Sequence, residues 1–341
     1  MCTSKFQTIV DIPEFHWKTG YGNKNLFMGS CFTENVGNRM KALKYDVDIN
    51  PFGILYNPVS VANGLLILLE NKKFQQEDLV EHDGLWHSFY HHGRFSGINI
   101  DETIAKINTR INQSAIFLKE TDFLFLTFGT SWIYEYKKTG QTVSNCHKIP
   151  AKEFKRFRLT PGEIIEEYRE LLSEIWKINP DLKVIFTVSP IRHWKDGAIE
   201  NQLSKATLLL AIERIIQGFG KKKCAYFPAY EIVMDELRDY RFYTEDMIHI
   251  SEVAINHIWS IFEQNLIKEE SRKTAKQVQK ITKALNHLPF NPYSNEYLEF
   301  LERTLNQTVE MELQFPNLNF ELEKKHFNIK IDEIKNQSEH F

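Results

Sequence analysis

Short hydrophobic runs alternate with longer amphipathic segments along most of this chain. Five runs end in turn-forming residues and are predicted as strands: Asn25–Met28, Tyr45–Ile49, Phe123–Phe128, Val184–Val188 and Ala225–Pro228. The runs at Phe123–Phe128 and Val184–Val188 are almost continuously apolar, which is typical of strands that are buried on both faces.

Segments with helical periodicity separate and follow these runs. They are Glu34–Lys44, Val59–Leu69, Pro161–Trp176, Ala206–Phe219 and a segment from Ser251 to about Leu266. Thr160 before Pro161 is typical of a helix start, and Ser251 is a second predicted N-cap. Strands that alternate with helices predict an α/β fold, in which helices cover both faces of a mostly parallel five-stranded sheet.

Two internal stretches and the C-terminal part interrupt this alternation. Trp132–Tyr136 and Gln141–Val143 flank a turn and predict a hairpin, whereas Glu81–Gly97 is loop-like and rich in histidine and aromatic residues. After Leu266 the pattern predicts helices at Lys268–Leu285 and Tyr297–Leu305, followed by a polar tail over 317–341. We therefore expect a main domain over 1–266 and a C-terminal helical extension with a polar tail over 267–341.

The composition and net charge of the chain limit the classes of function that are expected for this protein. The 341 residues include 42 Lys and Arg and 45 Asp and Glu, so the net charge of −3 argues against a nucleic-acid-binding protein that relies on positive charge. No apolar run is long enough for a secretory signal or a membrane span. The four cysteines are widely spaced without a CxxC pair, which indicates free thiols and a cytoplasmic location.

Candidate chemistry lies at the predicted strand ends, where parallel α/β sheets bind their ligands. Ser30 follows the first strand and precedes a helix, whose N-terminal N–H groups stabilise a developing oxyanion. A serine nucleophile needs a base, and His249 can serve as one, with Asp246 three residues earlier to orient its imidazole. From position alone, a helix cap at Ser30 and a surface histidine at 249 explain these residues equally well.

An ordered set of motifs begins with Met28-Gly29-Ser30-Cys31-Phe32, followed by Thr33. The other motifs lie in the segments 50–58, 126–132, 145–148, 188–193 and 246–249. Together they resemble the GSCFA-domain family, which is itself similar to the SGNH/GDSL hydrolases, and Thr33 stands in the fifth place of the family's name. The likeness therefore covers about residues 20 to 265.

The resemblance implies a three-layer α/β/α hydrolase fold with Ser30 as nucleophile, His249 as base and Asp246 as its partner. It also implies an oxyanion hole formed by Ser30, Gly53 and the position of Ser131. Ser131 stands where the SGNH pattern has an asparagine. Because a hydroxyl is shorter than a carboxamide, Ser131 reaches less far toward the oxyanion, and Asn57 is therefore an alternative donor.

Several further residues are candidates for substrate binding because they lie near the expected site: Asn57, Trp86, Trp132, His147, Arg192 and His193. The aromatic residues of the 81–97 insert are expected to line or cover the cleft over Ser30. The same insert holds four histidines, but it lacks a recognised metal-ligand spacing such as HExxH, so we expect no metal and no other cofactor.

We therefore predict an ester hydrolase that acts on a small-molecule or carbohydrate O-acyl ester, without nucleic-acid or membrane partners. Three alternatives stay open: an acyltransferase with the same Ser-His-Asp site, a non-catalytic binding module on this fold, and a metal-dependent phosphoesterase. The C-terminal segment carries none of the motif residues and is expected to serve packing or oligomer contact. The sequence leaves the oligomeric state open.

Overall fold

The centre of the fold is a parallel sheet of five strands, seen in a computed structural model that describes residues 8–338. The strands are β1 (Asn25–Gly29), β2 (Val47–Ile49), β5 (Phe123–Phe128), β9 (Lys183–Val188) and β10 (Cys224–Tyr226). Their order is β10-β9-β5-β1-β2, and β1 pairs with β5 in parallel from Asn25 opposite Phe123 to Gly29 opposite Thr127. The predicted parallel sheet is thus confirmed, and all its strands end at one edge.

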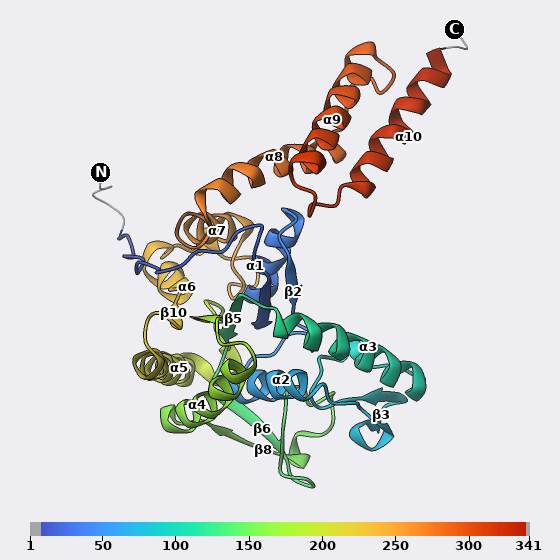
Figure 1. Ribbon diagram of the computed structural model, residues 1–341. Helices are drawn as coiled ribbons and strands as arrows, with labels where there is room; N and C mark the ends of the chain where they lie inside the picture. The colour runs from blue at the N-terminus through green and yellow to red at the C-terminus, as the bar shows by residue number, and fades with distance from the viewer. Residues whose placement is uncertain (1–7, 339–341) are drawn as a thin grey trace. The chain divides into compact units, whose positions relative to one another are not determined.

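Side chains that alternate along these strands fill two cores. Leu124, Leu126 and Phe128 of β5 face the larger core, which also includes side chains from α2 (Pro58–Glu70), α3 (Ile100–Lys119), α4 (Pro161–Ile178) and α5 (Gly197–Phe219). On the other face, the Phe125 ring lies 5.6 Å from Phe262 of α7 (Glu252–Leu266), and α1 (Cys31–Ala42) begins directly after β1. Figure 1 shows these helices on either side of the sheet, which gives the expected three layers.

Local sequence explains where these helices begin. The Asn57 Oδ1 accepts a hydrogen bond from Ser60 N at 2.8 Å at the start of α2, and Thr160 forms a capping box with Glu163 at the start of α4. Both helices have proline near their first position, where its missing N–H costs nothing. The caps leave the helix starts well defined beside the sheet.

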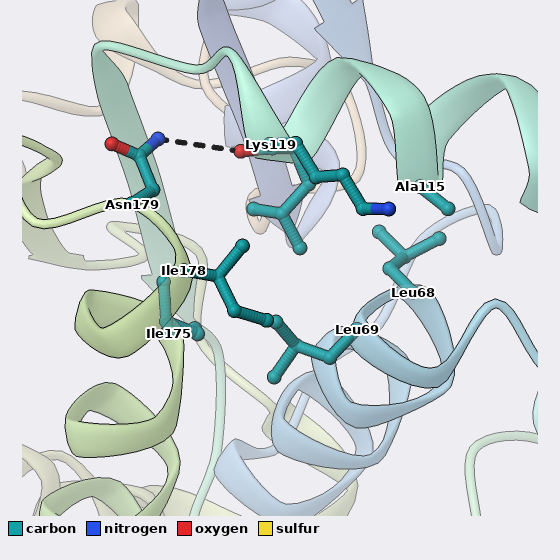
Figure 2. A pocket seen from close by; sticks show the side chains of 8 residues that line it. Leu68, Leu69, Ala115, Lys119, Ile175, Ile178 and Asn179 are labelled. Atoms are coloured by element: carbon teal, nitrogen blue, oxygen red, sulfur yellow. Dashed lines mark hydrogen bonds between the residues drawn. The ribbon is translucent and has the colours of Figure 1, made fainter.

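The C-terminal ends of α3 and α4 pack with α2 around a small apolar pocket (Figure 2). Its wall includes Leu68 and Leu69 of α2, Ala115 of α3 and Ile178 of α4. Because α3 and α4 each lead directly into a strand, this pocket lies at the edge where the strands begin. It is therefore a packing feature at the edge opposite the predicted site.

Two insertions extend from the segments that connect consecutive strands of the parallel sheet, one between β2 and β5 and the other between β5 and β9. The first carries the hairpin of β3 (Val80–His82) and β4 (Leu85–His87), and the second carries an antiparallel sheet in the order β7-β6-β8. These strands are β6 (Trp132–Tyr136), β7 (Gln141–Val143) and β8 (Phe154–Arg158), so the predicted hairpin is confirmed and gains a third strand. A short helix, α6 (Ala229–Glu231), follows β10.

The C-terminal residues form a separate helical unit together with residues 39–45. Its helices are α8 (Glu269–Leu285), α9 (Asn295–Gln314) and α10 (Glu321–Ser338). Within this unit, Lys44 forms an ion pair with Glu323 at 2.8 Å, and its ammonium lies 4.8 Å from the centre of the Phe320 ring. The first compact unit comprises the remaining residues up to Ile267.

Three segments differ from the sequence-based expectation. The predicted polar tail forms α10 over most of its length, because Phe327, Ile331 and Ile334 recur at helical spacing and are buried. Helix α9 extends well beyond the predicted Tyr297–Leu305. Helix α3 was not predicted, although Asn99 caps it and Ile107 and Ile111 form part of its buried stripe.

Candidate active site

Ser30 lies in a tight turn between β1 and α1, and Gly29 makes this turn possible. The φ angle of Gly29 is +141°, and a Cβ atom there would lie 2.2 Å from the carbonyl oxygen of Thr127. The Gly29 N–H donates to Asn50 Oδ1 at 2.9 Å, and the Ser30 N–H donates to Thr127 O at 3.3 Å. The position before the serine therefore requires glycine.

The Ser30 hydroxyl is not used as a helix cap. Its Oγ is buried and has no hydrogen-bond partner among residues 8–338, although Ser30 occupies the position from which a capping serine accepts an N–H of the first turn. The residue is only 1% exposed, so a substrate reaches this oxygen only when the groups covering it move. A helix-cap role for Ser30 thus has no support in these contacts.

His249 and Asp246 form a close pair in the loop before α7. The imidazole Nδ1 lies 2.5 Å from Asp246 Oδ2, and Asp246 Oδ1 accepts from Thr244 Oγ1 and from the N–H groups of Ile248 and His249. The bond with the His249 side chain, followed by these backbone bonds, holds the pKa of Asp246 well below its ordinary value. An ionised Asp246 places the imidazole proton on Nδ1 and leaves Nε2 free to act as a base.

The structure thus forms one of the two hydrogen bonds that a Ser-His-Asp triad requires. The pair of His249 and Asp246 is present, whereas Ser30 Oγ bonds to neither residue. The His249 side chain is 56% exposed, in contrast to the buried serine. The assembly of all three residues therefore stays a prediction.

Gly53 lies in a turn that follows β2. It has a φ of +80°, and its N–H donates to Asn50 O at 2.8 Å rather than pointing to an open site. A Cβ atom at this position would lie 2.3 Å from His92 Cβ, so glycine is required for the approach of the insert. Gly53 shapes this strand end, and in this conformation its N–H is already paired.

Ser131 is completely buried in a cluster of hydroxyl groups. Its N–H and its Oγ both bond to Ser204 Oγ on α5, at 2.8 and 3.1 Å, and the Thr130 hydroxyl joins the same oxygen at 3.0 Å. These bonds tie the segment after β5 to α5. The Ser131 hydroxyl, which was predicted for the oxyanion hole, is therefore engaged in a structural contact.

The 81–97 insert reaches the strand ends through polar side chains. Arg94 Nη2 donates to Asn50 O at 2.8 Å, and Arg94 Nη1 bonds Glu34 Oε1 of α1 at 2.6 Å. The His92 N–H donates to Phe52 O at 2.8 Å. These contacts join the insert to both β2 and α1.

The aromatic residues of the insert have other packing partners. The Phe89 ring lies 4.8 Å from Tyr136, Tyr90 packs edge-on against Phe74, and Phe95 belongs to the main core. Trp86, a predicted substrate contact, pairs with Glu81 in the β3–β4 hairpin. Their hydrophobic area thus anchors the insert to the domain.

A pocket of about 430 Å³ adjoins the ends of β5 and β9. Three predicted substrate-binding residues line it, namely Asn57, Trp132 and His193, together with Tyr56 and Arg156. His193 packs edge-on against Tyr56 at 5.4 Å, and burial lowers the pKa of its imidazole to about 4. The pocket therefore presents aromatic faces and a neutral imidazole to a ligand.

The other two predicted substrate contacts differ in their surroundings. Arg192 Nη2 contacts Met234 Sδ at 3.2 Å, and its buried Nε has no partner within the described part of the chain. His147 is buried, its Nε2 donates to Ser88 O at 2.9 Å, and burial lowers its pKa to about 4. His147 thus fastens the insert, whereas Arg192 keeps hydrogen-bonding capacity near the strand ends.

Lys205 is a site-forming residue that the sequence pattern did not single out. It is fully buried on α5, and its Nζ donates to the carbonyl oxygens of Gly129, Ser189 and Ile191 at 2.7, 2.7 and 3.0 Å. Burial lowers its pKa to about 7. Lys205 precedes the predicted helix over 206–219, and its buried neighbours on α5 include Asn201 and Ser204, so the apolar periodicity gave no signal for it.

Both parts of the sequence match known protein families. Residues 24–262 match the GSCFA family, and residues 278–333 match the C-terminal domain of GSCFA domain proteins. This chain belongs to the GSCFA family. The match includes Ser30, Asn50, Lys205 and His249, so the whole region described above lies within the family domain.

A comparison with solved structures finds an acetyl xylan esterase, Est2A, from the rumen bacterium Butyrivibrio proteoclasticus. The two are 11% identical with a TM-score of 0.35, and the match covers 75% of this chain and 66%, just under two thirds, of the esterase chain. Curated protein sequences gave no match. Within residues 8–338 there is no helix of the length and apolarity that crossing a membrane requires, and no group of three or more His, Cys, Asp or Glu residues that could hold a metal ion.

Proposed function

We propose that this GSCFA protein is a serine ester hydrolase with Ser30 as nucleophile, His249 as general base and Asp246 as the group that orients it. The observation that carries the proposal is the Ser30 hydroxyl, which lies at the carboxyl edge of the sheet and at the start of α1 without serving as a cap. The Asp246–His249 pair supports it, because the pair leaves a basic Nε2 available.

The reaction follows the acyl-enzyme route. Ser30 Oγ attacks the carbonyl carbon of the ester while its proton passes to His249 Nε2, and the tetrahedral oxyanion forms. Collapse of this intermediate breaks the carbon–oxygen bond to the alcohol, which takes the proton from His249. Water then attacks the acyl-enzyme with His249 again as base, which releases the acid and restores Ser30.

The pocket beside the strand ends supports an ester with a polar alcohol, such as an acylated carbohydrate. Tyr56 and Trp132 offer aromatic surface, and Asn57 and His193 offer polar groups, a combination that suits a ring bearing hydroxyl groups. Arg156 lies over the Trp132 ring at 4.2 Å and thereby holds this wall of the pocket in place.

Labelling with a fluorophosphonate probe tests the proposal. The wild-type protein should label at Ser30, whereas S30A should not, and the labelled peptide should be identified by mass spectrometry. Because Ser30 is covered, we expect labelling to be slow, and an ester substrate that occupies the site should slow it further by competing with the probe. A folded wild-type protein that never labels would instead support a binding module.

A panel of p-nitrophenyl acyl esters and acetylated sugars then defines the substrate. Release of acid in water indicates hydrolysis, whereas transfer of the acyl group to an added sugar alcohol indicates an acyltransferase. Both activities use the same acyl-enzyme, and only the acceptor differs. In either case S30A should lose the activity.

A further inference from the structure

Asn50 is held rigidly against the residue that precedes the proposed nucleophile. Its Oδ1 accepts the Gly29 N–H at 2.9 Å, and its own N–H donates to Phe27 O at 2.8 Å. Its carbonyl oxygen accepts from Gly53 N–H and from Arg94 Nη2, both at 2.8 Å. The backbone and the side-chain oxygen of Asn50 are therefore fixed from several directions.

The amide nitrogen of the same side chain has no hydrogen-bond partner. Asn50 is 1% exposed, and its Nδ2 makes no hydrogen bond to any residue that the structure describes. Reversing the amide would not satisfy it, because the Gly29 N–H needs an acceptor and would then face an NH₂ group. A buried donor without a partner costs about 1–3 kcal/mol, so such a group in a well-packed turn calls for a ligand.

The nearby atoms point to the identity of this ligand. Ser30 Oγ is another buried atom that has no partner among residues 8–338, and Gly29 connects Ser30 to Asn50 directly. The donors expected from the SGNH pattern are engaged, because Gly53 N–H bonds Asn50 O and Ser131 bonds Ser204. Asn50 Nδ2 is therefore a free buried donor on a side chain that is bonded to the residue before Ser30, where an ester attacked by Ser30 would develop its oxyanion.

We propose that Asn50 Nδ2 is an oxyanion-hole donor, which replaces the missing asparagine of the SGNH pattern from a different strand end. The inference rests on the proposed hydrolase function. In this arrangement the carboxamide binds the Gly29 N–H with its oxygen and the developing oxyanion with its nitrogen. The carboxamide is pre-oriented by its neighbours, so little reorganisation accompanies the reaction.

The variant N50D tests the donor with little change in shape. Asn50 has a φ of +43°, which aspartate and glycine tolerate, and aspartate keeps an acceptor for Gly29 N–H while it removes the NH₂ group. N50G keeps the backbone conformation and removes the side chain. N71D is a matched control, since Asn71 has a φ of +47° at the end of α2, away from the strand ends that hold Ser30.

Each variant is compared with the wild type for the rate of fluorophosphonate labelling and, with a p-nitrophenyl ester, for kcat and KM separately. Thermal unfolding establishes that each variant is folded. We expect N50D and N50G to label about 10²–10³-fold more slowly, with the loss in kcat rather than KM, and N71D to label at the wild-type rate. Wild-type labelling rates in folded N50D and N50G would refute the role of Asn50, and a wild type that never labels would refute both proposals.

Discussion

Replacing Lys205 with methionine tests how the strand ends of β5 and β9 are held together. The substitution keeps a long, unbranched side chain but removes the group that bonds Gly129 O, Ser189 O and Ile191 O. At pH 9, above its pKa of about 7, the folded Lys205 is uncharged, so the substitution costs mainly the buried carbonyls left without a donor, about 1–3 kcal/mol each. We expect K205M to be less stable than the wild type by about 2–4 kcal/mol at pH 9.

The pH dependence of this difference carries the sharper test. Burial lowers the pKa of Lys205 from its ordinary 10.5 to about 7, so between these values the unfolded chain binds a proton that the folded chain does not. Wild-type stability should therefore increase with pH, at up to about 1.4 kcal/mol per pH unit, or about 2 kcal/mol between pH 7 and 9. The stability gained above pH 7 is lost again as the pH falls toward 7. K205M should lack this pH-dependent contribution to the free energy of unfolding.

Urea unfolding at pH 7, 8 and 9 measures both quantities. Subtracting the unfolding free energy of K205M from that of the wild type at each pH removes the contributions of groups that titrate in both proteins, including the cysteines. K137M is the matched control, because the exposed Lys137 also donates to a carbonyl, that of Lys152 at 2.7 Å, and its loss should change stability by less than about 0.5 kcal/mol. Parallel pH profiles for wild type and K205M would refute the assignment of a lowered pKa to Lys205.

Three further predictions concern other parts of the molecule. D246N should slow the labelling of Ser30 roughly 10²–10⁴-fold, because the amide no longer fixes the imidazole tautomer; an unchanged rate in a folded protein would argue against the triad. G29A should be destabilised by several kcal/mol, about 3 or more, in urea unfolding, since its Cβ would overlap Thr127 O. F327A should destabilise the C-terminal unit by about 3–5 kcal/mol while Ser30 still labels at the wild-type rate, and loss of labelling in the folded variant would contradict a separate role for that unit.

The sequence alone determined the layered core of this protein. Continuous apolar runs such as Phe123–Phe128 can be satisfied only between two helical layers, so their alternation with amphipathic helices predicted the parallel sheet. Parallel strands place their ends at one edge, and this rule alone groups Ser30 and the segments after the other strands into one candidate site. The pairing of Asp246 with His249 followed from their spacing of three residues.

The sequence was less informative where the hydrophobic periodicity of a segment was weak, or where the packing partners of a side chain are distant in the sequence. Helix α3 has a buried stripe of mixed apolar and small polar residues, and α10 has few apolar positions, so neither stood out by periodicity. The aromatic residues of the insert were expected over the cleft because of their number. Their packing against Phe74, Tyr136 and the main core depends on contacts that composition does not specify.

Only the tertiary structure decided which polar groups near the site are free. Ser131 and Asn50 are both small polar residues after a strand, and the sequence gives no reason to prefer the second. The fold pairs Ser131 with Ser204, which lies 73 residues further along the chain, and leaves the nitrogen of Asn50 without a partner among the residues described. Hydrogen-bond satisfaction depends on the three-dimensional neighbours of each atom, and neighbours so distant in sequence are fixed only when the chain folds.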